Sequence, residues 1–300
     1  MSLDPVRCPD CRASLKRSHA LAVCEGCGAT YRENAGVLDL IGSKSELNAS
    51  EVEVQDRVSA FYEDARYEKA ASRKYHDHTL DVLTRLAPPS GTVLDDGCGN
   101  GILFEYVRQR GLVVDSLYGI DLSIGMLKYA KKRHESVRGA NGEVLRADAQ
   151  RLPFADATFD VVYARSLLHH LPDPAGGARE MARVLKPGGT LVALDPNRTF
   201  LSALPRLLAR QGEHFDDDHK NFALSELVGL LGPDLSLEHI EFMGYLAYPL
   251  LGFPDLLDFG RVLPLDASLL AARGVAHRNQ HPRTDRRGHG DAWRRGVRRP

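Results

Sequence analysis

Short apolar runs alternate with amphipathic segments through the middle of the chain. Between residues 92 and 195, runs of strand length are separated by stretches whose apolar positions recur at helical spacing. Such alternation predicts a parallel sheet with helices on both faces. The predicted strands cover 92–95, 114–119, 143–147, 159–163 and 190–195, and the predicted helices cover 102–110, 123–133 and 174–185.

Capping residues and prolines mark the helix boundaries. Asp173-Pro174 is a typical helix start, and Pro187-Gly188-Gly189 is expected to end that helix and turn into the next strand. Ser50 and Glu53 fit a capping box, so one helix should begin there and a second should cover 70–86. Further predicted elements are helices near 199–210 and 224–231 and strands near 235–243 and beyond.

The chain is expected to have four parts: a small module, a polar linker with the start of the first helix, an α/β domain and a tail. These parts are residues 1–42, 43–56, 57–272 and 273–300. The tail is rich in Arg, Gly, Pro and His, and is expected to be disordered. Two apolar, proline-interrupted stretches are interpreted as a substrate lid or as a contact in a homodimer. They are residues 204–210 and 245–270.

Composition and charge narrow the class of protein. The chain has 300 residues, 43% of them hydrophobic, which is enough for one large packed domain and a small module. No stretch approaches the roughly 20 apolar residues of a membrane span, and no signal pattern begins the chain. We therefore expect a soluble cytoplasmic protein. Residues 1–42 are neutral, 43–272 carry a balance of −8 and 273–300 carry +7, so only the tail favours nucleic acid.

Four of the five cysteines form two CxxC pairs separated by twelve residues. In a cytosolic chain this spacing indicates a tetrahedral zinc site rather than disulfides. Four thiolates complete the coordination of Zn²⁺, so the site would be structural. The predicted ligands are Cys8, Cys11, Cys24 and Cys27.

A glycine-rich turn follows the first strand of the α/β domain. Gly97, Gly99 and Gly101 come at alternate positions, directly after Asp95 and Asp96. Glycine allows the backbone to approach a ligand closely, and the helix start beyond the turn exposes unpaired N–H groups. The turn therefore predicts a nucleotide-type site. A pyrophosphate would be repelled by two acids, whereas an ammonium or a sulfonium would be attracted.

Two more acids close the next two strands. Asp121 is spaced to bind ribose hydroxyls, and Asp148 is spaced to bind an adenine amine. The ligand so described has a positive head group, a ribose, an adenine and no phosphate. S-adenosylmethionine matches this description.

The chain resembles class I S-adenosylmethionine-dependent methyltransferases over about residues 57–250. Four motifs occur in the order and spacing of that family: VLDDGCGNG at 93–101, YGIDLS at 118–123, RADAQRLPFADATFDVVYARSLLHHLPDP at 146–174 and RVLKPGGTLVALDP at 183–196. The resemblance implies a Rossmann-like, seven-stranded, mostly parallel sheet with an antiparallel last strand. Residues 1–42 resemble small zinc-ribbon proteins that partner methyltransferases. They also resemble the ribbon of 23S rRNA guanine-N1 methyltransferases, which usually have a histidine at or near the position of Cys27.

The family resemblance also implies roles for particular residues. Asp95, Gly97 and Gly99 would line the methionine end of the cofactor, and Arg165 would close over it. The remaining cofactor-binding residues would be Asp121 at the ribose, Leu122 and Met126 near the adenine, and Asp148 and Ala149 at the adenine edge.

The motifs do not identify the residues that bind the methyl acceptor. His169, His170 and Asp195 lie on segments that reach the carboxyl edge of the sheet and are the candidate catalytic residues. In this family at least one of the two histidines is often structural, and an acid at the position of Asp195 is frequent without a catalytic role.

We interpret the chain as a methyltransferase enzyme acting on a small metabolite or natural product. The acidic main domain argues against a large polyanion. The first alternative is an rRNA base methyltransferase that grips RNA with its ribbon and tail. The second is a catalytically inactive cofactor-binding or scaffold protein, against which the intact glycine turn and the three acids weigh.

Overall fold

The computed structural model describes most of the chain. The described residues are 2–45, 70–139, 141–196, 222–244 and 265–274, together with Glu53, Asp56, Ser59 and Glu63. The predicted helix at 199–210, the apolar stretch at 204–210 and most of the predicted tail lie outside them. Of the helix expected to begin at Ser50, the described residues Glu53, Asp56 and Ser59 are helical.

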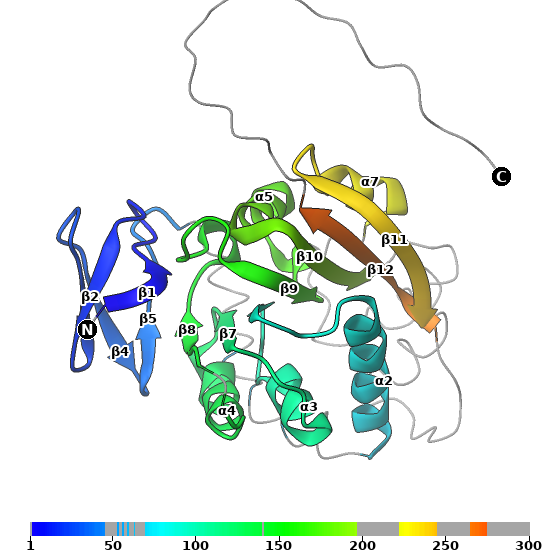
Figure 1. The fold of residues 1–300 in the computed structure, drawn as a ribbon, viewed down its shortest axis with the longest axis horizontal. Helices are drawn as coiled ribbons and strands as arrows, with labels where there is room; N and C mark the ends of the chain where they lie inside the picture. Colours follow the sequence, from blue (N-terminus) through cyan, green and yellow to red (C-terminus); the bar gives the residue numbers. More distant parts are fainter. Residues whose placement is uncertain are drawn as a thin grey trace, which may run out of the picture.

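A single sheet connects the described strands in the order β1-β2-β3-β4-β5-β8-β7-β6-β9-β10-β12-β11 (Figure 1). The strands are β1 (Ser2–Arg7), β2 (Ser14–Ser18), β3 (Leu21–Cys24), β4 (Thr30–Asn34), β5 (Val37–Asp39), β6 (Thr92–Asp96), β7 (Ser116–Asp121), β8 (Val144–Arg146), β9 (Phe159–Arg165), β10 (Leu185–Pro196), β11 (Leu235–Gly244) and β12 (Leu265–Gly274). Strands β5 to β10 pair in parallel within this order, and β12 is antiparallel to both of its neighbours. The α/β fold with a mostly parallel sheet and an antiparallel last strand is confirmed.

Helices cover both faces of the parallel part of the sheet. They are α2 (Ala70–Leu86), α3 (Ile102–Arg110), α4 (Ile124–Glu135), α5 (Pro174–Val184) and α7 (Leu224–Leu230), with short 3₁₀ turns η2 (Ala149–Arg151) and η3 (Leu168–His170). Figure 1 shows α2, α3 and α4 on one side of the sheet and α5 and α7 on the other. Among the described residues, no helix combines the length and the apolar content needed to cross a bilayer.

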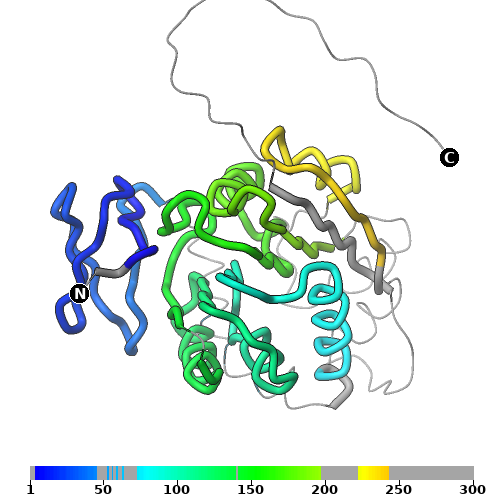
Figure 2. Tube along the Cα trace, in the orientation of Figure 1, coloured from blue at the N-terminus to red at the C-terminus, as the bar shows by residue number. Residues whose placement is uncertain are grey.

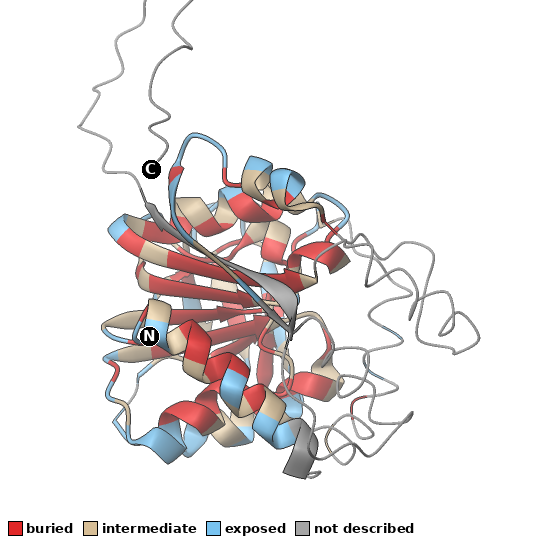
Figure 3. Ribbon diagram, turned by 90° about the vertical axis from the view of Figure 1, so that its right-hand side faces the viewer, coloured by how far each residue is buried: buried red, intermediate tan, exposed pale blue. Residues whose placement is uncertain are grey.

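Two hydrophobic clusters form the core, one on each face. Leu83, Val107 and Leu127 from α2, α3 and α4 belong to one cluster, and Met181 and Leu227 from α5 and α7 belong to the other. Figure 3 shows the central strands buried along most of their length. Each fully buried side chain of this size contributes about 1.5–3 kcal/mol of transfer free energy. This burial holds the carboxyl ends of the parallel strands in fixed positions.

One prediction about the C-terminal elements is wrong. Residues 265–270, expected to belong to a lid or a homodimer contact, lie in β12, which inserts between β10 and β11. This strand continues to Gly274. Its two antiparallel partners supply backbone hydrogen bonds that outweigh the weak strand preference of its alanines.

The start of β10 also differs from the prediction. The strand begins at Leu185, which pairs with Phe159, and its register shifts before Thr190. Gly188 has a φ of +81° within this irregularity. Pro187-Gly188-Gly189 therefore interrupts a strand instead of preceding one.

The N-terminal strands extend the sheet beyond β8 (Figures 1 and 2). Strand β5 pairs antiparallel with β4 and parallel with β8. Val37, Leu38 and Leu40 are fully buried, with relative exposures of 0%, 1% and 0%. Residues 1–42, which we call the ribbon, thus share a sheet and a core with the α/β domain. The domain boundaries given above remain predictions.

Candidate cofactor and active site

The glycine turn lies between β6 and α3. Gly97 has a φ of +73°, and a Cβ there would lie 2.9 Å from Cδ1 of Leu167. Gly99 has a φ of +53°, and none of the described residues has an atom within 4 Å of where its Cβ would be, so they leave space beside the backbone. A side chain at Gly97 would meet both strain and a clash, while the space at Gly99 suits a closely approaching ligand.

Asp121 connects the glycine turn to the end of β7. Its Oδ2 accepts a hydrogen bond from the backbone N–H of Gly99 at 2.9 Å, and its Oδ1 accepts from that of Ser123, also at 2.9 Å. Burial raises the pKa of Asp121, and these backbone donors oppose the rise. Each carboxylate oxygen keeps a second lone pair, so the group can still bind a hydroxyl.

Asp148 is placed at the start of η2, directly after β8. Its Oδ1 accepts from the backbone N–H of Gln150 at 2.8 Å. Its Oδ2 is buried and has no hydrogen-bond partner among the described residues. An orphaned acceptor is costly in a folded protein, and a ligand N–H would satisfy it. Asp148 thus fits the predicted adenine amine.

Asp95 and Asp96 end β6 as a buried acidic pair. Burial raises the pKa of Asp95 to about 7, with Arg165 opposing and Asp121 adding to the rise. Asp96 is 0% exposed, and neither of its oxygens has a partner among the described residues. Burial, followed by the charges of Asp95 and Asp148, raises the pKa of Asp96 well above its ordinary range. A cationic ligand would relieve this concentration of acid.

The other predicted cofactor residues surround this edge. Met126 and Ala149 are buried, at 5% and 6% exposure, and the carbonyl of Leu122 accepts from Nε of Arg146 at 2.8 Å. Arg165 ends β9, where its Nη1 lies 3.3 Å from Nδ1 of His76 on α2. The open turn, the orphaned acceptor and the acid cluster together fit a ligand with a positive centre and an adenine.

The structure brings the three predicted catalytic residues together, with His169 hydrogen-bonded to Asp195 and stacked on His170. Nδ1 of His169 lies 2.8 Å from Oδ1 of Asp195, which also accepts from the backbone N–H of His169 at 3.1 Å. Asp195 is completely buried, and its Oδ2 has no partner among the described residues. The carboxylate fixes a proton on Nδ1, which leaves Nε2 as the acceptor. The ring of His170 packs against that of His169 at 4.0 Å.

Sequence reasoning missed four residues that support the site. Asp56 accepts from the backbone N–H of Gly125 at 2.8 Å at the start of α4, and Glu63 accepts from Nδ2 of Asn100 at 2.7 Å. These two acids thus lie beside the start of α4 and the glycine turn. His76 and Arg146 are the other two. Nothing in the sequence distinguishes these side chains from ordinary polar residues of a helix or a strand end.

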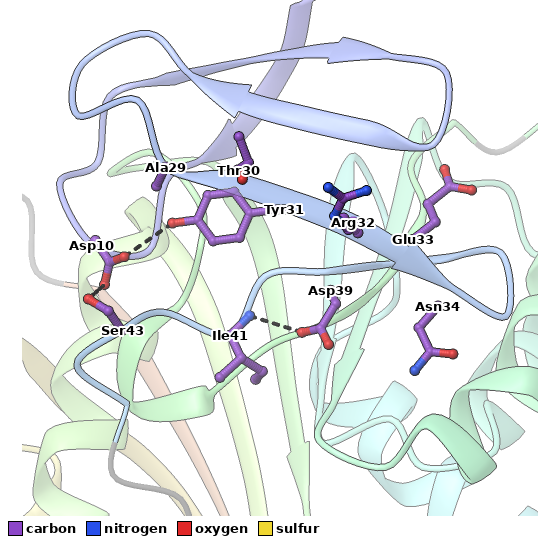
Figure 4. A pocket seen from close by; sticks show the side chains of 10 residues that line it. All are labelled: Asp10, Ala29, Thr30, Tyr31, Arg32, Glu33, Asn34, Asp39, Ile41 and Ser43. Atoms are coloured by element: carbon purple, nitrogen blue, oxygen red, sulfur yellow. Dashed lines mark hydrogen bonds between the residues drawn. The ribbon is translucent and has the colours of Figure 1, made fainter.

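The four cysteines of the ribbon converge. Their Sγ atoms all lie within 4.8 Å of one another, with Cys8 3.7 Å from Cys27 and Cys11 3.4 Å from Cys24. A tetrahedral site with Zn–S bonds of about 2.3 Å places the sulfurs about 3.8 Å apart. The four cysteines therefore fit a zinc ion. A separate hollow of about 490 Å³ lies on the ribbon, lined by residues between Asp10 and Ser43 (Figure 4).

Known methyltransferases match this chain. A family model described as a methyltransferase domain matches residues 94–193. A ubiquinone biosynthesis O-methyltransferase of Hahella chejuensis is 35% identical over 53% of this chain and 67% of its own length. A demethylmenaquinone methyltransferase of Bacillus licheniformis is 33% identical over 42% of this chain and 53% of its own length.

One solved structure shows the same fold. It is a magnesium protoporphyrin IX methyltransferase of Synechocystis PCC 6803 with bound S-adenosylhomocysteine. It has a TM-score of 0.54 and 17% identity, and the match covers 75% of this chain and 99% of that one. The chain belongs to the class I S-adenosylmethionine-dependent methyltransferase family. The chain spans only about half to two thirds of the curated relatives named above.

Proposed function

We propose that this protein transfers a methyl group from S-adenosylmethionine to a small-molecule acceptor. The observation that carries the proposal is the acidic edge at β6, β7 and β8, where Asp95, Asp121 and the orphaned Oδ2 of Asp148 lie at successive strand ends. Ligands of such sheets bind at the carboxyl ends of the strands. The cofactor would bind with its methionine end at Asp95, its ribose at Asp121 and its adenine at Asp148.

The acceptor class is inferred from charge and from the relatives. The α/β domain and its flanking segments, residues 43–272, carry a balance of −8, which opposes binding of a polyanion. The Hahella and Bacillus relatives are named for ubiquinone and menaquinone, which are small molecules. A small-molecule acceptor is therefore favoured over rRNA.

His169 is proposed as the general base, with Asp195 orienting it. S-adenosylmethionine, when bound, supplies an electrophilic methyl group on a sulfonium. The protein must hold the acceptor in line with that methyl group and take up the acceptor proton. Nε2 of His169 would receive this proton when Asp195 holds the proton of Nδ1. The bound cofactor would supply the methyl carbon, and its sulfur would leave with the electron pair of the carbon–sulfur bond.

The ribbon is proposed to hold one structural zinc ion through Cys8, Cys11, Cys24 and Cys27. The support is the distance between their sulfurs, which matches a tetrahedral thiolate site. Metal analysis of protein purified without chelators should give about one zinc per chain. A value near zero would refute this assignment.

The function is tested with methyl-labelled S-adenosylmethionine. Purified protein and label are incubated with a lysate of the source organism, and the nucleic acid, protein and small-molecule fractions are separated. Label in the small-molecule fraction supports the proposal, whereas label in nuclease-sensitive material favours the rRNA alternative. Absence of both transfer and cofactor binding would favour the inactive scaffold.

The base is tested separately with His169→Gln. This variant should still bind S-adenosylhomocysteine, while its turnover falls by about 10²–10⁴-fold. Unchanged turnover would remove His169 from the mechanism. His134→Gln is the control, because His134 is a partly buried histidine on α4 whose ring binds the carbonyl of Leu117, outside the proposed acceptor site.

A further inference from the structure

The ribbon joins the sheet at β8, the strand that precedes Asp148, the proposed adenine ligand. Leu38 and Asp39 of β5 align with Leu145 and Arg146 of β8, and the backbone N–H of Leu40 donates to the carbonyl of Arg146 at 2.8 Å. Asp148 follows Arg146 by two residues. A shift of β5 would therefore displace the end of β8, which lies just before the proposed adenine-binding residue Asp148.

Arg146 links the ribbon to a second part of the same subsite. Its Nη1 donates to Oδ2 of Asp39 at 2.7 Å, and its Nε donates to the carbonyl of Leu122 at 2.8 Å. Leu122 follows Asp121, the proposed ribose ligand. One guanidinium group thus holds the loop after β7 to a carboxylate that belongs to the ribbon. A planar fork of donors suits this bridge, and an ammonium group would not span both acceptors.

Asp39 is itself fixed within the ribbon. Its Oδ1 accepts from the backbone N–H of Ile41 at 3.2 Å (Figure 4). Across the hollow in the same view, Asp10 accepts from Tyr31 at 3.3 Å and from Ser43 at 3.1 Å. The hydroxyl of Tyr31 also lies 3.2 Å from Sγ of Cys8. Ser43, four residues after Asp39, is thus joined through Asp10 and Tyr31 to the cysteine cluster.

We propose that the ribbon sets the shape of the adenine subsite through the bridge Asp39–Arg146–Leu122. Asp39 and Arg146 are positioning residues that act through the Leu122 loop and the end of β8. This inference rests on the proposed cofactor function. When the bridge is intact, the loop after Asp121 and the segment before Asp148 are held at the spacing that an adenosine requires.

The test compares cofactor affinity in matched variants of the full chain. Asp39→Asn and Arg146→Lys each break the bridge. Arg17→Gln is the control, because Arg17 also joins the ribbon to the α/β domain, through Glu143 at 2.8 Å. The Arg17–Glu143 pair has exposures of 27% and 25%, close to the 21% and 27% of the Arg146–Asp39 pair. Isothermal titration with S-adenosylhomocysteine gives the dissociation constant for each variant, and zinc content and melting temperature are recorded alongside.

Asp39→Asn and Arg146→Lys should each raise the dissociation constant about fivefold, with little further loss in the double variant, whereas Arg17→Gln should stay within about twofold. In steady-state assays the KM for S-adenosylmethionine should rise while kcat is retained. Equal weakening in Arg17→Gln, or unchanged affinity in Asp39→Asn, would overturn the inference while leaving the proposed function intact. If the natural chain does not bind S-adenosylhomocysteine, the proposed function fails and this inference fails with it.

Discussion

Asp96 provides a quantitative test of how the fold holds a buried acid. It is completely buried in β6, and its two oxygens have no hydrogen-bond partner among the described residues. Burial, with the charges of Asp95 and Asp148 next in effect, raises the pKa of Asp96 well above its ordinary range. Asp96→Asn keeps the size and polarity of the side chain but removes the titrating proton. The variant should therefore change the pH dependence of stability.

The size of the effect follows from proton linkage. Above pH 3.9 the unfolded chain releases the proton of Asp96, while the folded protein keeps it until the raised pKa is reached. The folded state then binds more protons, so its stability falls as pH rises. The slope is about 1.4 kcal/mol per pH unit for one group. From pH 5 to pH 7 the stability of the natural protein should therefore fall relative to that of Asp96→Asn, because burial raises the pKa of Asp96.

Urea unfolding followed by circular dichroism at pH 5, 6 and 7 measures this difference. Asp156→Asn is the control, because the side chain of Asp156 is 72% exposed, and it should track the natural protein at all three pH values. A constant difference between Asp96→Asn and the natural protein from pH 5 to pH 7 would refute the reasoning. It would mean that Asp96 is ionised in the folded state at pH 5.

Three other outcomes are expected. The affinity for S-adenosylmethionine should rise several-fold from pH 6 to pH 8, because its positive charge favours ionised Asp95, whose pKa is raised to about 7 by burial; calorimetry showing an equal rise for S-adenosylhomocysteine, which lacks the sulfonium charge, would contradict this. Asp148→Asn should keep the hydrogen bond from the backbone N–H of Gln150 but weaken S-adenosylhomocysteine binding about tenfold, since the new amide NH₂ would face the adenine amine. Unchanged affinity would show that Asp148 does not bind the adenine. Cys24→Ser should lower bound zinc and the melting temperature together, and a variant that loses zinc without loss of melting temperature would show that the metal is not structural.

The sequence predicted the parallel sheet because its signals are local. Helices over 70–86 and 102–110 begin and end at the predicted residues, since Pro88 ends the first and Gly101 and Gly111 flank the second. The acids at positions 95, 121 and 148 were found because each lies at, or just after, the end of a strand. Their positions relative to one another follow from the shared edge of a parallel sheet.

The parts that the sequence did not predict depend on contacts between distant segments. Nothing local to Val37, Leu38 and Asp39 indicates that they pair with β8, because a short apolar run is equally typical of an isolated ribbon. A last antiparallel strand was expected, but its bounds at Leu265–Gly274 were not predicted, since its alanines gain a strand conformation only between two partners. The contact between His169 and Asp195 joins residues 26 apart in sequence. Each of these features needs tertiary structure to be seen.

The pairing of β5 with β8 also has a consequence for the order of folding. The ion pair between Asp39 and Arg146 joins residues 107 positions apart, so the ribbon leaves the ribosome long before its partner strand is synthesised. During that interval β5 has an open edge, and Leu38 and Leu40, which end up fully buried, have no α/β domain to pack against. If zinc binds the four cysteines of the ribbon early, the ribbon can fold before β8 is synthesised, which would limit wrong pairing of the open edge of β5. Growth in zinc-poor medium should therefore reduce the yield of soluble chain more than removal of zinc from the finished protein reduces its solubility.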